Sequence, residues 1–191
     1  MSTYPSPLLF MQKFLSNPLQ VGSIIPSSRF LGQKMAGAVP WRETRTVVEL
    51  GAGTGAITKH LLAQMHEDCR VWLFEKDNLM RKRLEEQFSG FTCHSHAESL
   101  TLVIRQSGFE HVDCIVSGLP FFNFPPALRE TILSQVYQAL KPGGRFIAFQ
   151  YSLQMKPKLA ERFELEQLAF VPLNFPPAFV YICRKKGGTS K

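Results

Sequence analysis

The sequence has few cysteines, no long hydrophobic run and no recognisable targeting segment. Its four cysteines, among 191 residues, are widely spaced and form no CxxC pair, so neither a zinc site nor a disulfide framework is indicated. No apolar stretch approaches the ~20 residues of a membrane-spanning helix, and no signal-peptide pattern opens the chain. A hydrophobic content of 45% suffices for one buried core. We therefore expect a single soluble domain in the cytoplasm.

Positive charge is concentrated towards the two ends of the chain. The net charge is +7, and the balance of Lys and Arg over Asp and Glu is +4 for residues 1–45, −3 for 46–140 and +6 for 141–191. Such a distribution suits a polyanionic partner, which could be nucleic acid or an anionic membrane surface. A basic surface that only aids solubility explains it equally well.

From residue 46 onward, β-branched and aromatic runs alternate with helical patterns. Strands are expected at 46–50, 70–75, 91–96, 112–117 and 145–151, with helices at 56–65, 78–88, 99–106 and 126–140. Successive strand–helix units predict a doubly wound, Rossmann-like α/β sheet with right-handed crossovers. After a short helix at 158–163, strands at 166–172 and 178–184 lie too close for a crossover helix, which predicts an antiparallel hairpin.

The first 45 residues precede the sheet and differ from it in kind. Most apolar residues from Leu8 to Leu15 fall on one side of a helical wheel, and a second helix is expected at 29–38. We therefore divide the single domain 1–191 into a helical extension (1–45), a core (46–186) and a flexible tail (187–191). The extension could cover the ligand pocket as a lid, dock on a membrane, or do both.

A glycine-rich turn directly follows the first strand, in the sequence Glu49-Leu-Gly-Ala-Gly-Thr-Gly55. Glycines let the backbone turn tightly and approach a ligand, and the following helix offers free N–H groups. The GxGxxG spacing of dinucleotide-binding folds would require glycine at Ala56. Glu75, at the end of the second strand, suits the two hydroxyls of a ribose. Glu49 would repel a pyrophosphate and attract an amino group.

Together these features resemble the class I S-adenosylmethionine-dependent methyltransferases. The glycine motif, the acid after strand two, Leu140-Lys-Pro-Gly-Gly144 and the final hairpin follow that family's order over roughly residues 46–184. The resemblance implies a seven-stranded sheet of order 3-2-1-4-5-7-6 with strand seven antiparallel. It also implies that S-adenosylmethionine is the cofactor. The residues expected to bind it are Glu49, Gly51, Ala52, Gly53, Thr54, Gly55, Glu75, Lys76, His96, Ala97 and Ser117.

The acid that usually follows strand three in this family, and receives the adenine amino group, has no obvious counterpart. The segment reads His94-Ser-His-Ala-Glu98, so His96 or Glu98 could take that place. Alternatively, both histidines are surface residues beside a strand end. No metal is indicated, because Cys93, His94 and His96 lack an obvious fourth ligand.

The loop after strand four reads Ser117-Gly-Leu-Pro-Phe121, and in this fold it faces the transferred methyl group. It resembles the N-L-P-Y motif of rRNA adenine dimethyltransferases, but Gly118 stands where their asparagine accepts hydrogen bonds from the base amine. With the upstream segment QVGSIIPSS, the S-x-L-P form is more similar to the bacterial phospholipid N-methyltransferases. The residues expected to carry catalysis are Ser117, Gly118, Leu119, Pro120 and Phe121.

The predicted activity is therefore N-methylation of a phospholipid amine, from phosphatidylethanolamine towards phosphatidylcholine, at an anionic membrane surface. Such a transfer mainly requires alignment of a neutral amine with the methyl group. Phe121, Phe122 and Tyr151 are candidates for cation–π contacts with the substrate. The alternatives are N6-methylation of rRNA adenine, with nucleic acid the less favoured partner, methylation of a small amphiphilic metabolite or peptide, and a binding module without turnover.

A short repeat supports a shared role for two loops. Residues 123–127 and 174–178 both read NFPPA, and strands four and six should end at the same edge of the sheet. The two loops could form an apolar mouth for an acyl chain. Proline pairs that merely stop strands and start helices would also explain the repeat.

Overall fold

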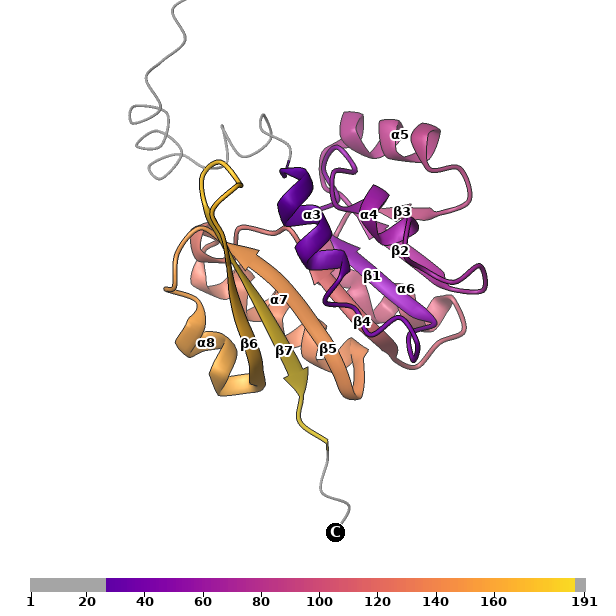
Figure 1. The fold of residues 1–191 in the computed structure, drawn as a ribbon. Helices are drawn as coiled ribbons and strands as arrows, with labels where there is room; N and C mark the ends of the chain where they lie inside the picture. Colours follow the sequence, from indigo (N-terminus) through magenta and orange to yellow (C-terminus); the bar gives the residue numbers. More distant parts are fainter. Residues whose placement is uncertain (1–26, 188–191) are drawn as a thin grey trace, which may run out of the picture.

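A computed structural model describes residues 27–187, in which a seven-stranded sheet carries helices on both faces (Figure 1). The strands are β1 (Thr46–Leu50), β2 (Arg70–Phe74), β3 (Thr92–His94), β4 (Val112–Ser117), β5 (Leu140–Gln150), β6 (Phe163–Val171) and β7 (Ala178–Lys185). The helices are α3 (Arg29–Ala36), α4 (Thr58–Leu62), α5 (Asn78–Gln87), α6 (Leu100–Gln106), α7 (Pro126–Ala139) and α8 (Lys156–Arg162). Two 3-10 turns are η1 (Ala97–Ser99) and η2 (Phe121–Asn123).

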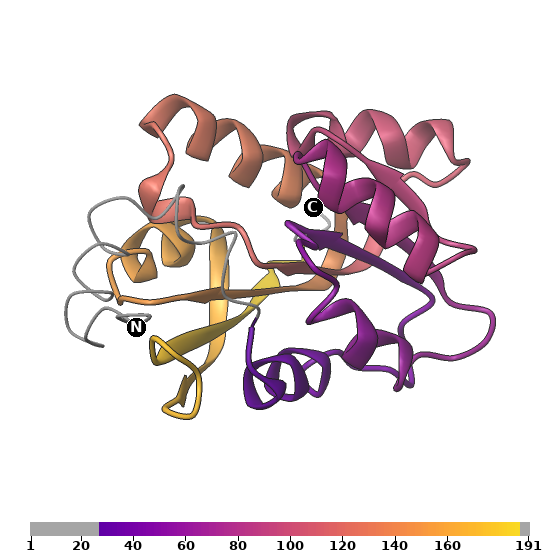
Figure 2. The ribbon, with the colours of Figure 1, turned by 90° about the horizontal axis from the view of Figure 1, so that it is seen from above.

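The strand order is β3-β2-β1-β4-β5-β7-β6, and β7 runs antiparallel to both of its neighbours. This confirms the predicted doubly wound sheet and its terminal hairpin. Strands β1 to β5 are parallel to one another, and β6 has the same direction because both β5 and β6 are antiparallel to β7. All strands except β7 therefore end at one edge of the sheet. We call it the carboxyl edge, and Figure 2 views the molecule from above it. In doubly wound folds, ligands bind at this edge.

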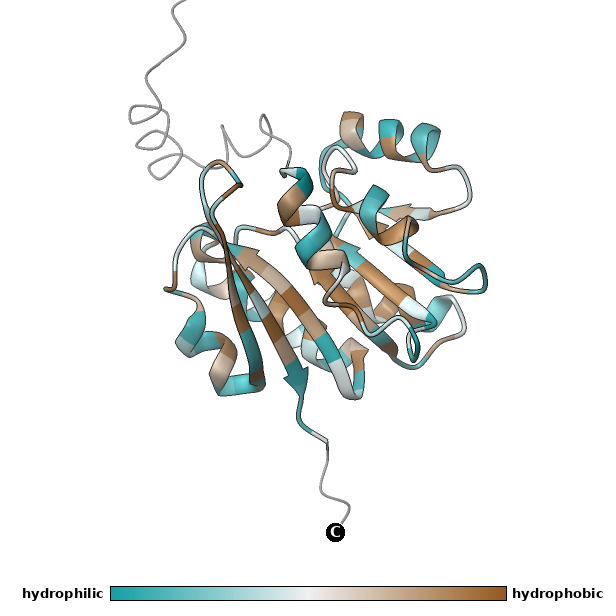
Figure 3. Ribbon diagram, viewed as in Figure 1, coloured by the Kyte–Doolittle hydropathy of each residue, from teal (hydrophilic) through white to brown (hydrophobic). Residues whose placement is uncertain are grey.

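Two hydrophobic layers hold the sheet. Successive strand residues point to opposite faces, so Val47 packs in the layer that contains Leu31 and Met35 of α3, while Val48 packs with Leu133 of α7. Figure 3 shows the hydrophobic residues concentrated on the strands. Helix α3 belongs to the core, because Leu31 and Met35 are fully buried. None of the helices within residues 27–187 has the length and hydrophobicity that crossing a bilayer requires.

Some predicted boundaries were wrong. Strand β5 begins at Leu140, which pairs with Val112, so Lys141-Pro-Gly-Gly144 is part of the strand and not a connecting loop. The pairing accommodates an irregularity between Val112 and Cys114. Strand β6 begins at Phe163, three residues before the predicted start at residue 166, because Phe163 pairs with Lys185. Helix α4 is shorter than expected. The helix predicted around residues 8–15 and the last four tail residues lie outside the described part of the chain.

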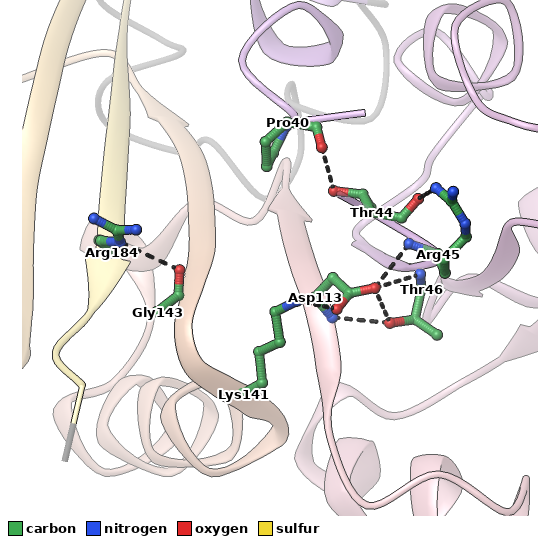
Figure 4. Close-up of polar contacts among 8 residues, drawn as sticks. All are labelled: Pro40, Thr44, Arg45, Thr46, Asp113, Lys141, Gly143 and Arg184. Atoms are coloured by element: carbon green, nitrogen blue, oxygen red, sulfur yellow. Dashed lines mark hydrogen bonds and ion pairs between the residues drawn. The ribbon is translucent and has the colours of Figure 1, made fainter. Parts of the chain in front are cut away.

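At the opposite, amino edge, one carboxylate connects three strands (Figure 4). Asp113 Oδ2 accepts hydrogen bonds from the N–H groups of Arg45 and Thr46, at 2.8 and 2.9 Å, and from the Thr46 hydroxyl at 2.9 Å. Asp113 Oδ1 lies 2.6 Å from Lys141 Nζ on β5. Burial opposes ionisation, but the hydrogen bonds from Lys141, Arg45 and Thr46 lower the pKa of Asp113 overall. The starts of β1, β4 and β5 are thereby held together.

Candidate functional site

The glycine turn after β1 lies over the end of β2. The N–H groups of Gly51 and Ala52 both donate to the Phe74 carbonyl, at 2.8 and 3.1 Å. Gly53 and Gly55 have φ angles of 55° and 76°, which favour glycine. A Cβ at Gly55 would lie 2.4 Å from Phe88, whereas one at Gly53 would meet nothing within 4 Å. Gly55 thus permits close packing under the turn, while Gly53 borders open space.

Glu75, directly after β2, fixes this turn from the side. Its Oε2 accepts the Gly53 N–H at 2.8 Å, and its Oε1 accepts the Asp77 N–H at 2.9 Å. Carboxylate oxygens have about four lone-pair positions between them, so both can accept further hydrogen bonds. The neighbouring Lys76 is exposed. A half-buried, oriented carboxylate therefore stands beside the space over Gly53.

Glu49, on β1 two residues before Gly51, is fully buried. Its Oε2 accepts a hydrogen bond from the Thr58 hydroxyl at 2.7 Å, while its Oε1 has no partner among the described residues. Burial raises the pKa of Glu49 to about 8; the Thr58 bond opposes this shift and the charge of Glu75 adds to it. Buried polar atoms are normally hydrogen-bonded. An unpaired carboxylate oxygen here fits a site that receives a cationic or donor group of a ligand.

The segment after β3 reaches the same edge. The Glu75 N–H donates to the His94 carbonyl at 2.8 Å, and the His94 ring lies 5.2 Å from that of Phe74. Burial lowers the pKa of His94. His96 is exposed, with Nδ1 2.6 Å from Ser95 Oγ, and Glu98 is exposed as well. His96 and Ala97 thus follow the end of β3, the strand whose last residue, His94, contacts Glu75. A role of His96 or Glu98 towards adenine stays a prediction.

The loop 117–121 packs directly against the glycine turn. The Gly118 N–H donates to the Leu50 carbonyl at 2.8 Å, and a Cβ at Gly118 would lie 3.0 Å from the Gly51 carbonyl oxygen. Ser117 is buried, and its Oγ accepts the Leu119 N–H at 3.2 Å. The predicted cofactor and catalytic segments are therefore adjacent, and Ser117 shapes the loop between them.

Two residues of the site were missed from the sequence. Gln150, buried at the end of β5, donates from Nε2 to the Leu119 carbonyl at 2.9 Å and so holds the loop in place. A polar residue that ends the apolar run Phe146-Ile-Ala-Phe149 was an available signal. Thr58, the partner of Glu49, carries no comparable signal in the sequence.

The three aromatic candidates occupy different environments. Phe121 is only 1% exposed and packs on Phe124 and Phe146, with ring centroids 6.1 and 6.0 Å away, which fits a supporting role in the core. Phe122 is 47% exposed. Tyr151 is half-buried, and burial raises its pKa to about 12 against the effect of a hydrogen bond with Asn174. Phe122 and Tyr151 are therefore the better placed of the three to meet a substrate.

The two NFPPA segments both lie at the carboxyl edge, as predicted, but their local roles differ. The first forms the end of η2 and the start of α7. In the second, the buried Asn174 accepts the Ser28 N–H at its Oδ1 (2.9 Å) and donates from Nδ2 to the Pro176 carbonyl (2.7 Å). Ser28 is the N-cap of α3. The second segment therefore anchors α3, and the apolar mouth stays a prediction.

Comparisons with known proteins agree with this geometry. Residues 47–144 match the family described as "Methyltransferase domain". An ornithine lipid N-methyltransferase from Singulisphaera acidiphila is 36% identical over 182 residues, which cover 92% of this chain and 94% of the relative.

Two of the solved structures that share the fold differ in the molecules that their names mention. The first is the 1,6-didemethyltoxoflavin N1-methyltransferase of Burkholderia thailandensis with bound 1,6-didemethyltoxoflavin and S-adenosylhomocysteine. It superposes with a TM-score of 0.66 at 16% identity, over 97% of this chain and 93% of that one. The second, an rRNA methylase from Streptococcus thermophilus, gives 0.57 at 16% identity, over 81% and 93%. The shared fold therefore does not separate one substrate class from another.

Proposed function

The chain belongs to the family of S-adenosylmethionine-dependent methyltransferases, and on that premise we propose that it methylates the aliphatic amine of a membrane lipid. The proposal is carried by the relative that matches 92% of the chain and is named for an ornithine lipid. The S-x-L-P loop suggests phosphatidylethanolamine instead. Both lipids present an amine on an amphiphilic molecule, so the amine lipid is the proposed substrate class.

The carboxyl edge fits S-adenosylmethionine. We assign the ribose hydroxyls to the Glu75 carboxylate, which is already oriented by the N–H groups of Gly53 and Asp77. The unpaired Oε1 of Glu49 suits the cationic methionine end of the cofactor. When bound, the cofactor supplies an electrophilic methyl group. The remaining residues proposed to line its site are Gly51, Ala52, Thr54, Gly55, Lys76, His96, Ala97 and Ser117.

The loop 117–121 would align the amine. Its backbone is held on one side by Leu50 and on the other by Gln150, which fixes the Leu119 carbonyl. Residues 117–126 contain no carboxylate or imidazole. Tyr151 keeps its phenol proton at neutral pH, because its pKa is raised to about 12. We therefore propose that the lipid ammonium loses its proton to water, while Phe122 and Tyr151 face the growing cationic head group.

The packing of Gly118 favours a lipid amine over an RNA base. The rRNA dimethyltransferase motif places asparagine at this position, but a side chain on Gly118 would meet the Gly51 carbonyl oxygen at 3.0 Å. The loop therefore lies too close to the glycine turn for that residue without a backbone shift. A flexible aliphatic amine does not need the hydrogen bonds that the asparagine provides.

The substrate class is tested with methyl-labelled cofactor. Purified protein is incubated in parallel with vesicles that contain phosphatidylethanolamine, vesicles that contain an ornithine lipid, and deproteinised ribosomal RNA. We expect label in the solvent-extracted lipid of at least one vesicle arm and none in RNA. Addition of S-adenosylhomocysteine, the product of the transfer, should suppress the signal. Label confined to the RNA would overturn the proposal.

The raised pKa of Glu49 predicts a proton release on cofactor binding. At about pH 6.5 the buried carboxyl is mostly protonated, since its pKa is about 8, and a bound cation favours the ionised form. Binding should therefore release up to about one proton, and affinity should rise with pH towards 8. Calorimetry in two buffers of different ionisation enthalpy measures the proton count. Glu49→Gln should release none from this site, so equal counts for variant and wild type would contradict the assignment.

A further inference from the structure

Exposed apolar side chains gather on the loops of the carboxyl edge. Phe122 in η2, Leu153 between β5 and α8, and Leu173 between β6 and β7 are 47, 44 and 63% exposed, and Phe30 and Phe175 are exposed beside them. Figures 1 and 2 show these loops at one end of the molecule, on the β6 side. We call these five side chains the apolar rim. Within residues 27–187, none of the large exposed hydrophobic residues lies in an amino-edge loop.

Contacts between the loops make the rim one surface. Gln150, the last residue of β5 and directly before the loop of Leu153, holds the Leu119 carbonyl in the loop of Phe122. Tyr151 shares a hydrogen bond with Asn174, which follows Leu173. Asn174 in turn binds the Ser28 N–H at 2.9 Å, next to Phe30. The tips are therefore held in a fixed relation to one another and to the catalytic loop.

The charged residues in the four segments that carry the rim are all positive. Segments 27–30, 118–128, 151–158 and 172–177 contain Arg29, Lys156 and Lys158 and no acidic residue. Lys158 pairs with Glu161 at 3.6 Å, and the Arg29 guanidinium lies 4.7 Å from the Phe30 ring centroid. The amino-edge loops, by contrast, carry acids such as Glu67 and Glu110. Apolar tips with cations in the same segments are the combination that binds an anionic bilayer, through apolar burial and through attraction to lipid charge.

We propose that the apolar rim is the membrane-docking surface, and that it enters the boundary between head groups and acyl chains of an anionic bilayer. The inference rests on the proposed function, because docking there sets the loop 117–121 against the lipid head groups. Leucine tips and few cations suit a bilayer better than RNA, whose binding depends on many phosphate contacts. The substrate amine then reaches the cofactor without leaving the membrane surface.

The test compares two leucines of the rim with a third leucine, outside it, of similar exposure. Leu153→Ser/Leu173→Ser alters the rim, while Leu102→Ser alters an exposed leucine on α6 that is 56% exposed and lies outside these loops. Both variants are made in the full chain. Binding is measured by co-sedimentation with vesicles of phosphatidylcholine and phosphatidylglycerol that contain no amine lipid, so that the substrate site makes no contribution.

We expect the rim variant to lower the partition coefficient by about tenfold or more, and Leu102→Ser to leave it unchanged, since only the rim leucines would enter apolar surroundings. Thermal unfolding and cofactor binding should match wild type for both variants. Equal vesicle binding by the rim variant and wild type would overturn the proposal, and would point to residues 1–26 or to charge alone. So would a failure of the wild-type protein to bind these vesicles.

A second readout separates this proposal from the proposed function. A short-chain amine lipid below its critical micelle concentration is dissolved as single molecules, so its methylation requires the methyl-transfer site but no docking on a membrane. The rim variant should retain wild-type activity on that substrate and lose it on vesicles that contain the amine lipid. If neither protein methylates any amine lipid but the rim variant still loses vesicle binding, the proposed function fails and the docking surface stands.

Discussion

Replacing Glu75 by alanine is expected to weaken S-adenosylmethionine binding by about 100-fold or more. Two charge-assisted hydrogen bonds to the ribose would be lost, each worth about 1.5–3 kcal/mol. The Gly53 and Asp77 N–H groups would also lose the acceptor that orients the glycine turn, at 2.8 and 2.9 Å. Since about 1.4 kcal/mol corresponds to tenfold in affinity, the combined loss reaches this size.

Calorimetry or equilibrium dialysis with the cofactor measures the effect. Glu86→Ala removes an exposed acid from α5 and is the matched control for the change in net charge. Thermal unfolding of both variants shows whether the fold is retained. A Glu75→Ala protein that folds and binds the cofactor with the wild-type dissociation constant would show that the ribose lies elsewhere.

Gly118→Ala is expected to lower kcat/KM by about tenfold, because a misplacement of about 1 Å can cost about 100-fold and the contact requires the neighbouring backbone to give by a few tenths of an ångström. The added Cβ would lie 3.0 Å from the Gly51 carbonyl oxygen, which belongs to the backbone and not to a flexible side chain. Either the loop 117–121 or the glycine turn must therefore shift. We expect kcat to fall and KM to rise, since the change lies between the two segments that are proposed to bind the cofactor and to align the amine.

The initial rate with an amine lipid, at several cofactor and lipid concentrations, provides both constants. Gly187→Ala, where a Cβ meets nothing within 4 Å, controls for the substitution itself. Wild-type turnover by Gly118→Ala would mean that the loop and the turn are not as tightly coupled as their packing indicates.

Local patterns predicted most of the fold because each strand and helix carries its own periodicity. Residues 46–50 are apolar enough to be buried on both faces, and the short gap before residue 178 leaves room only for a hairpin. The start of β5 could not be predicted in this way. It depends on the pairing of Leu140 with Val112 and on the Lys141–Asp113 ion pair, which join residues far apart in the sequence.

The candidate site shows the same division. The glycine turn and Glu75 were evident from motif and position, and the structure brings them within hydrogen-bond distance. The raised pKa of Glu49 and the contact of Gln150 with Leu119 depend on burial in three dimensions. Adjacent phenylalanines look alike in a sequence, but the 3-10 turn η2 sends Phe121 into the core and leaves Phe122 exposed.

The contacts of Asp113 with Arg45, Thr46 and Lys141 bear on how substrate preference could change during evolution or by design. Asp113 connects the starts of β1, β4 and β5 at the amino edge, whereas the rim side chains are exposed at the opposite edge. Exposed positions such as Phe122 and Leu153 can therefore be exchanged for other apolar groups at little cost to folding. The buried Asn174, in the loop between β6 and β7, cannot be exchanged in the same way, because it anchors α3 through Ser28. A loop transplanted between β6 and β7 should keep that asparagine, whichever lipid it is meant to recruit.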